Sequence, residues 1–110
     1  EAASIPIITG LINRGVEVIV YDPQDNKARD IFGDRVEFAK EKYEAVEDTD
    51  ALILLTEWKE FDSPDFNKLR EKMNGNQLFD LRNRWLPQAA NRVGFSYHGV
   101  GRNYSLGNSR

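Results

Sequence analysis

The chain has 110 residues, of which 40% are hydrophobic and 30% are charged, and this length and composition are typical of one globular domain with a single core. Its formal net charge is -3, and it has neither a basic block nor an apolar run of the roughly 20 residues needed to span a bilayer, so we expect neither nucleic acid nor a membrane as a partner. The absence of cysteine excludes disulfides, thiolate metal sites and cysteine nucleophiles from this chain.

The first half of the chain alternates helical and extended patterns. Apolar residues after Ser4 recur at the spacing of one helix face, and Gly15 follows them as a left-handed cap. The β-branched run 16–21 then predicts a buried strand that Pro23 ends. The further elements predicted here are a helix over residues 24–32 that finishes at Gly33, a short strand at 36–38 and a short helix at 43–46.

The second half continues the alternation. Residues 51–56 (ALILLT) form the most apolar run, which is typical of a central strand covered on both faces. Ser63 and Pro64 are a cap and a first helical residue for a helix that Gly75 ends. The remaining predicted elements are a strand at 77–81, a helix at 87–93 stopped by Gly94 and a strand at 95–100.

Alternating helices and strands with short connections predict an α/β fold. We expect three layers, in which a mostly parallel sheet of about five strands is flanked by helices. The pattern shows no interior domain boundary, so residues 1–102 are expected to form one domain, and residues 103–110 form a polar tail.

Candidate site residues follow from the position of the strands. In open parallel sheets, ligands bind beyond the carboxyl ends of the strands. The polar or aromatic candidates at these ends are Thr56, Glu57, Trp58, Lys59, Asp80, Arg82 and Asn83. Arg82 stands out because a guanidinium offers a planar fork of donors to phosphate or carboxylate oxygens, although a surface ion pair is the alternative. Trp58 could stack on a base or simply pack at its strand end.

Other polar residues are not assigned to chemistry. Asp22 follows a strand, but no GxGxxG precedes it, so a helix cap is the better interpretation. The single histidine, His98, lies in a predicted strand and is interpreted as structural. Carboxylate pairs such as Asp62 and Asp65 have no histidine or cysteine beside them, so no metal site is predicted. No catalytic residue is assigned to this chain.

Four segments carry a resemblance to a known family. In chain order they are SIPIITGLINRGVEVIVYDP, TDALILLTEWKEFDSPDFNKLR, FDLRNRW and GFSYHGVGR. Their order and spacing over residues 4–102 resemble the C-terminal domain of the UDP-glucose/GDP-mannose dehydrogenase family. The resemblance implies an incomplete Rossmann-like domain that helps to close over a UDP-sugar.

The resemblance also implies what lies outside the chain. Family members join an N-terminal NAD-binding domain, a central dimerising region and this third domain. The parent would oxidise UDP-glucose to UDP-glucuronate in two steps with NAD, through a thiol adduct on an upstream cysteine, so the isolated domain is expected to be inactive. NAD would be bound mainly by the N-terminal domain. The expected partners are a UDP-sugar and the N-terminal domains of the same chain, in a cytoplasmic homodimer or larger oligomer that serves polysaccharide biosynthesis.

One motif transfers a role to a specific residue. The FDGRN motif of the family stands here as FDLRN at residues 79–83, and its arginine contacts substrate, which implies the same for Arg82. Leu81 replaces the usual glycine, so a positive φ is disfavoured there. The TEWKEF block favours UDP-glucose, while a UDP-N-acetyl-hexosamine or GDP-mannose stays open. A free-standing nucleotide-binding or response-regulator-like module is the alternative of another class.

Overall fold

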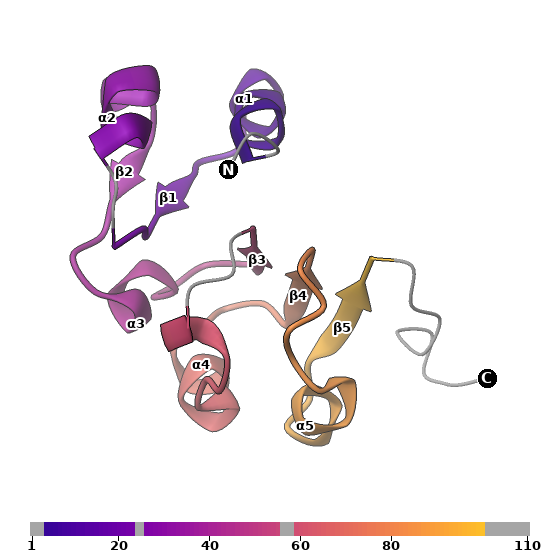
Figure 1. Cartoon of the computed structure of the whole chain (residues 1–110). Coiled ribbons are helices and arrows are strands. Elements are labelled where there is room, and N and C mark those ends of the chain that lie inside the picture. The colour runs from indigo at the N-terminus through magenta and orange to yellow at the C-terminus, as the bar shows by residue number, and fades with distance from the viewer. Residues whose placement is uncertain (1–3, 24–25, 56–58, 101–110) are drawn as a thin grey trace. The chain divides into compact units, whose positions relative to one another are not determined.

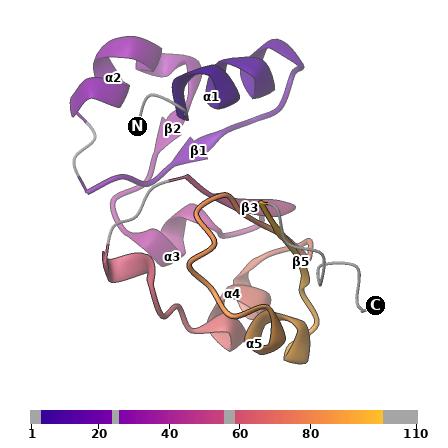
Figure 2. The same ribbon diagram turned by 45° about the vertical axis from the view of Figure 1, so that its right-hand side comes forward.

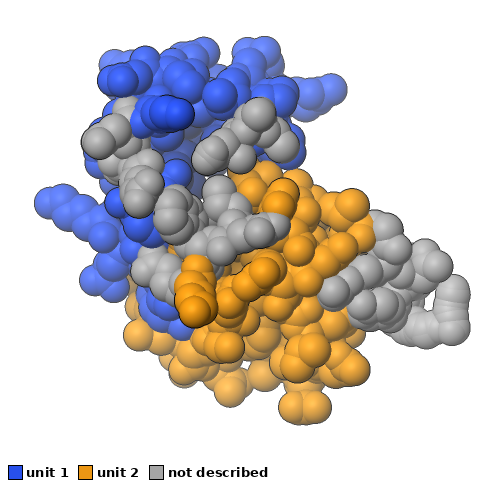
Figure 3. Space-filling view, viewed as in Figure 1, with its two compact units in different colours: residues 1–46 blue, residues 47–110 orange. Residues whose placement is uncertain are grey.

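The computed structural model describes residues 4–23, 26–55 and 59–100 (Figure 1). The chain divides into two compact units, residues 1–46 and residues 47–110, which Figure 3 colours separately. The predicted tail 103–110 lies outside the described residues.

The first unit has a small parallel sheet with two helices on one side of it (Figure 2). Its elements are α1 (Ser4–Asn13), β1 (Ile19–Val20), α2 (Asn26–Phe32), η1 (Gly33–Arg35), β2 (Glu37–Phe38) and α3 (Lys42–Ala45). Ile19 lies opposite Glu37 and Val20 lies opposite Phe38. The buried apolar side chains of this unit are Ile8, Phe32, Val36 and Val46.

Glycines end two helices of this unit, as the sequence predicts. Gly15 follows α1 with φ of 84°, and Gly33 follows α2 with φ of 55°. Nothing lies within 4 Å of a Cβ built at either position, so the positive φ is the reason that glycine suits both sites. Strand β1 is shorter than the predicted run 16–21 because its partner β2 is only two residues long.

The second unit has a three-stranded parallel sheet in the order β3-β4-β5, with α4 and α5 on the same side of it (Figures 1 and 2). Its elements are β3 (Ala51–Leu54), η2 (Lys59–Phe61), α4 (Phe66–Lys72), β4 (Gln77–Asp80), α5 (Pro87–Arg92) and β5 (Ser96–Gly99). The middle strand of this sheet is β4, and β3 lies at one edge of it.

The core of the second unit lies between this sheet and its helices. The buried apolar side chains are Leu54, Leu69, Met73, Leu78, Trp85, Ala90, Phe95 and Tyr97. The ring of Phe66 meets the ring of Trp85 edge to face, with centroids 5.8 Å apart, and lies 6.3 Å from the ring of Phe95. Such edge contacts between aromatic rings add to the stabilisation that burial gives.

A tight turn joins α4 to β4. The backbone N–H groups of Asn74 and Gly75 both donate to the carbonyl oxygen of Thr49, over 2.8 and 3.0 Å. A Cβ at Gly75 would lie 2.8 Å from the Asp50 Cα and carbonyl carbon, and closer still to the Asp50 oxygen. Only glycine therefore allows the backbones to approach this closely.

The α/β class and the parallel pairing are confirmed, with the five described strands in a two-stranded and a three-stranded sheet. The predicted start of α4 is wrong by two residues. Asp65 is the N-cap, and its carboxylate accepts from Lys68 N over 3.1 Å. A carboxylate at this position bonds the free N–H groups and suits the positive helix end, so it replaces Ser63 as the cap. No described helix has both the length and the apolar character that crossing a bilayer requires.

Candidate ligand-binding site

The three strands of the second unit end at the same level. Leu54 of β3 pairs with Asp80 of β4, which in turn pairs with Gly99 of β5. The loop after β4 begins at this edge, where Leu81 N donates to Leu54 O over 3.1 Å. Because ligands of open parallel sheets bind at the carboxyl edge, the loop of residues 81–85 is the centre of the candidate site. We call it the Arg82 loop.

A buried carboxylate holds the Arg82 loop. Asp80 has no exposed surface, and its Oδ1 accepts from the backbone N–H groups of Arg82 (3.2 Å) and Arg84 (3.1 Å). Its Oδ2 accepts from Trp85 N (2.8 Å) and from the hydroxyl of Tyr97 (2.7 Å). A charged group at this depth is stable only when its oxygens are hydrogen-bonded, and here both are. The loop therefore wraps around the carboxylate that precedes it.

The turn within the loop is left-handed at Asn83. This residue has φ of 54°, and its Nδ2 donates to Val100 O over 2.8 Å. Asparagine tolerates this conformation better than most residues because its short polar side chain can bond locally. Leu81 is not among the residues with positive φ. A leucine at position 81 is therefore compatible with this turn.

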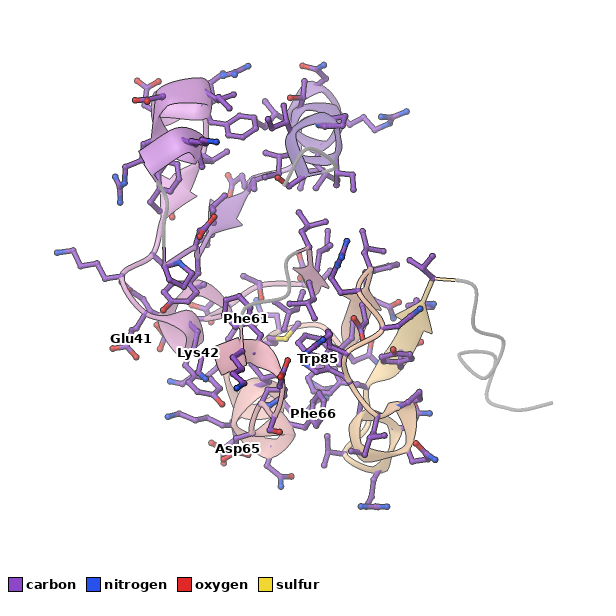
Figure 4. All side chains as sticks on the ribbon, viewed as in Figure 1. Glu41, Lys42, Phe61, Asp65, Phe66 and Trp85 are labelled. Carbon is purple, nitrogen blue, oxygen red and sulfur yellow. The ribbon has the colours of Figure 1, made fainter. Side chains whose placement is uncertain are left out.

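The loop is also tied to the segment that follows β3. The guanidinium of Arg84 binds the carboxylate of Asp62 through Nε (3.0 Å) and Nη2 (2.7 and 2.8 Å). The indole N–H of Trp85 donates to Phe61 O, and Figure 4 labels both residues together with Phe66. Two strand-end segments are thus held together on one side of the sheet edge.

The predicted site residues differ in their exposure, and three of them lie outside the described residues. Arg82 is exposed, and its backbone is fixed by Asp80. Asp80, a candidate at the end of its strand, lies beneath the loop with no exposed surface. Asn83 is half-buried, and Lys59 is exposed at the start of η2. Thr56, Glu57 and Trp58 lie outside the described residues.

The polar residues to which the sequence analysis assigns no chemistry have structural partners. His98 stacks on Phe79 with ring centroids 4.7 Å apart, and its Nε2 lies 2.9 Å from Gln77 Oε1. Asp62 pairs with Arg84 instead of standing as a solvated charge, and Asp65 caps a helix. Within residues 4–23, 26–55 and 59–100, no three histidine, aspartate or glutamate side chains gather as metal ligands would.

Comparison with known families decides what this arrangement belongs to. Residues 1–87 match the UDP binding domain of the UDP-glucose/GDP-mannose dehydrogenase family. The chain belongs to this family. The matched range contains Arg82 and the loop around it, which confirms the resemblance that the sequence motifs indicate.

Individual relatives agree with the family. Aligned segments covering 93% of the chain are 38% identical to a UDP-glucose 6-dehydrogenase of Pseudomonas aeruginosa, 35% identical to one of Rhizobium meliloti and 33% identical to the TuaD enzyme of Bacillus subtilis. These alignments cover 24%, 23% and 22% of the relatives. The chain therefore spans about a quarter of the length of the family members it matches, all oxidoreductases by name.

Proposed function

We propose that this domain supplies part of the nucleotide-sugar pocket of an NAD-dependent UDP-glucose 6-dehydrogenase, and that Arg82 contacts the bound UDP-sugar. The matched part of the family is its UDP binding domain, and the named relatives are UDP-glucose 6-dehydrogenases. The parent would oxidise UDP-glucose to UDP-glucuronate, and this domain would contribute binding and interdomain closure. Family membership also supports a cytoplasmic homodimer or larger oligomer.

The observation that carries the proposal is the combination of an exposed arginine with a fixed backbone. Arg82 lies at the carboxyl edge of the middle strand of its sheet, and Asp80 holds its backbone N–H. A guanidinium presents paired donors that match the oxygens of a diphosphate. A contact from a loop that is already ordered costs less entropy on binding than one from a flexible loop.

The residues of this chain do not fit a dinucleotide site. The segment after β1, Tyr21–Pro23, contains no glycine, and no GxGxxG precedes Asp22. The close approach of a pyrophosphate to a helix N-terminus depends on such glycines. We therefore assign NAD to another part of the parent, and the two-step oxidation as well, since the nucleophilic cysteine expected for the thiol adduct is not in this chain.

The test is steady-state kinetics of Arg82→Ala in the full-length protein. We expect kcat/KM for UDP-glucose to fall by roughly 30- to 150-fold, the range for losing a hydrogen bond to a charged group. Arg82→Lys should restore only part of the activity, because an ammonium cannot reproduce the planar paired contact. The matched control is Arg92→Ala, an exposed arginine in the last turn of α5, which should leave kcat/KM unchanged.

Two results would contradict the proposal. One is an unchanged kcat/KM for Arg82→Ala, and the other is a loss that a lowered melting temperature accounts for. Assays with UDP-N-acetylglucosamine and GDP-mannose in place of UDP-glucose decide the sugar: higher kcat/KM for either would reassign the substrate within the family.

A further inference from the structure

A buried tyrosine and a buried aspartate lie directly beneath the Arg82 loop. Tyr97 and Asp80 both have no exposed surface, and the Tyr97 hydroxyl donates to Asp80 Oδ2 over 2.7 Å. We propose that these two residues are positioning residues for ligand binding, which act by holding the loop in the conformation that presents Arg82. This inference rests on the proposed contact between Arg82 and the UDP-sugar.

The carboxylate of Asp80 binds the backbone of the loop at three places, namely the N–H groups of Arg82, Arg84 and Trp85. Each oxygen receives two donors, since Tyr97 completes the set. A carboxylate can accept on both oxygens, whereas an asparagine amide would turn one acceptor into a donor. In Asp80→Asn, at least one buried N–H of the loop would therefore face another donor, and the loop would have to rearrange.

Tyr97 allows the same network to be perturbed more gently. Tyr97 of β5 pairs with Leu78 of the middle strand, and its side chain has no exposed surface, so its ring is held by packing. Phenylalanine fills nearly the same volume and removes only the hydroxyl. Tyr97→Phe thus withdraws one of the two donors from Asp80 Oδ2 and leaves the aromatic packing in place.

A purely structural role would use the same contacts, so the test has to detect action through Arg82. A double-mutant cycle does this, because residues that act through a common group have non-additive effects. If Tyr97 and Asp80 matter for UDP only by positioning Arg82, then their substitution has nothing further to disturb once the guanidinium is gone.

The experiment measures the dissociation constant of UDP by calorimetry in the full-length protein. The variants are Tyr97→Phe, Asp80→Asn, Arg82→Ala and each of the first two combined with Arg82→Ala. We expect Tyr97→Phe to weaken UDP by about fivefold and Asp80→Asn by more, since the first removes one neutral donor from a charged acceptor and the second removes the charge. In the Arg82→Ala background, neither should weaken UDP further. Tyr43→Phe in α3 is the matched control and should not change the affinity.

The outcomes separate this inference from the proposed function. If Arg82→Ala leaves UDP affinity unchanged, the proposed contact between Arg82 and the UDP-sugar is wrong. The positioning role of Tyr97 and Asp80 is then wrong as well. If Arg82→Ala weakens UDP while Tyr97→Phe has no effect, or has the same effect in both backgrounds, the contact stands and positioning is overturned. Affinities are compared well below the melting temperature of each variant. If Asp80→Asn does not fold, the Tyr97→Phe cycle by itself tests the inference.

Discussion

Gly75→Ala should destabilise the second unit more than Gly94→Ala does. The added Cβ would lie 2.8 Å from two backbone atoms of Asp50 and closer still to its carbonyl oxygen. Backbone atoms cannot rotate away as the end of a flexible side chain can. The turn at residues 73–76 would have to move, and with it the two hydrogen bonds that Thr49 O accepts.

The magnitude follows from these contacts. Overpacking against a rigid neighbour costs about 1–3 kcal/mol, and each of the two hydrogen bonds contributes about 1 kcal/mol. We expect the free energy of unfolding to fall by at least about 3 kcal/mol, the lower end of the summed contributions. Gly94→Ala is the matched control, because Gly94 has φ of 100° but its Cβ would meet only Arg70 Nε at 3.6 Å. Its cost should be limited to the left-handed conformation, about 1–2 kcal/mol.

Native-state hydrogen exchange at the amides of β4 (Gln77–Asp80) measures both variants in the same unit. A loss of about 3 kcal/mol corresponds to exchange on the order of 100-fold faster in these amides when they open by unfolding of the unit. If the amides of Gly75→Ala exchange no faster than those of Gly94→Ala, the close approach between Gly75 and Asp50 does not determine the stability of the unit.

Three further predictions concern the cap, the ion pair and the isolated chain. Asp65→Ala should lower the stability by about 1 kcal/mol in a thermal melt, whereas Ser63→Ala should have no effect. The reverse result would show that Ser63 is the N-cap of α4. In urea denaturation, Arg84→Gln and Asp62→Asn should show a coupling energy of about 1 kcal/mol. This coupling should weaken with added salt, since the pair is about one-third exposed. Additive effects of the two substitutions would show that the ion pair does not contribute to stability. The isolated chain with NAD and UDP-glucose should form no NADH and bind UDP more weakly than micromolar; turnover above the buffer control would mean that the chain holds a complete site.

Local signals predicted most of the secondary structure. Gly15, Gly33 and Gly94 all have positive φ at helix ends, and Pro87 opens α5, because these effects depend on the residue's own backbone. The start of α4 was harder to predict, since Ser63 and Asp65 are both good caps and only the geometry of the chain chooses between them. The length of β1 depends on its partner strand, which no local pattern contains.

The site was predictable only in part. The position of Arg82 follows from the strand before it, and the role proposed for it rests on the family motif. The burial of Asp80 could not be predicted, because it depends on a hydroxyl that lies 17 residues further along the chain. The pairing of Arg84 with Asp62 spans 22 residues, and neither residue has a neighbour in sequence that marks it as a partner.

The way in which Asp80 holds the loop separates shape from side-chain identity. Three of its four hydrogen bonds come from backbone N–H groups, which every residue except proline possesses. Substitutions at positions 82 and 84 can therefore change the charge and reach that the loop presents while its path stays the same. Such a loop is suited to redesign for a different anionic ligand, with proline as the residue to avoid at these positions.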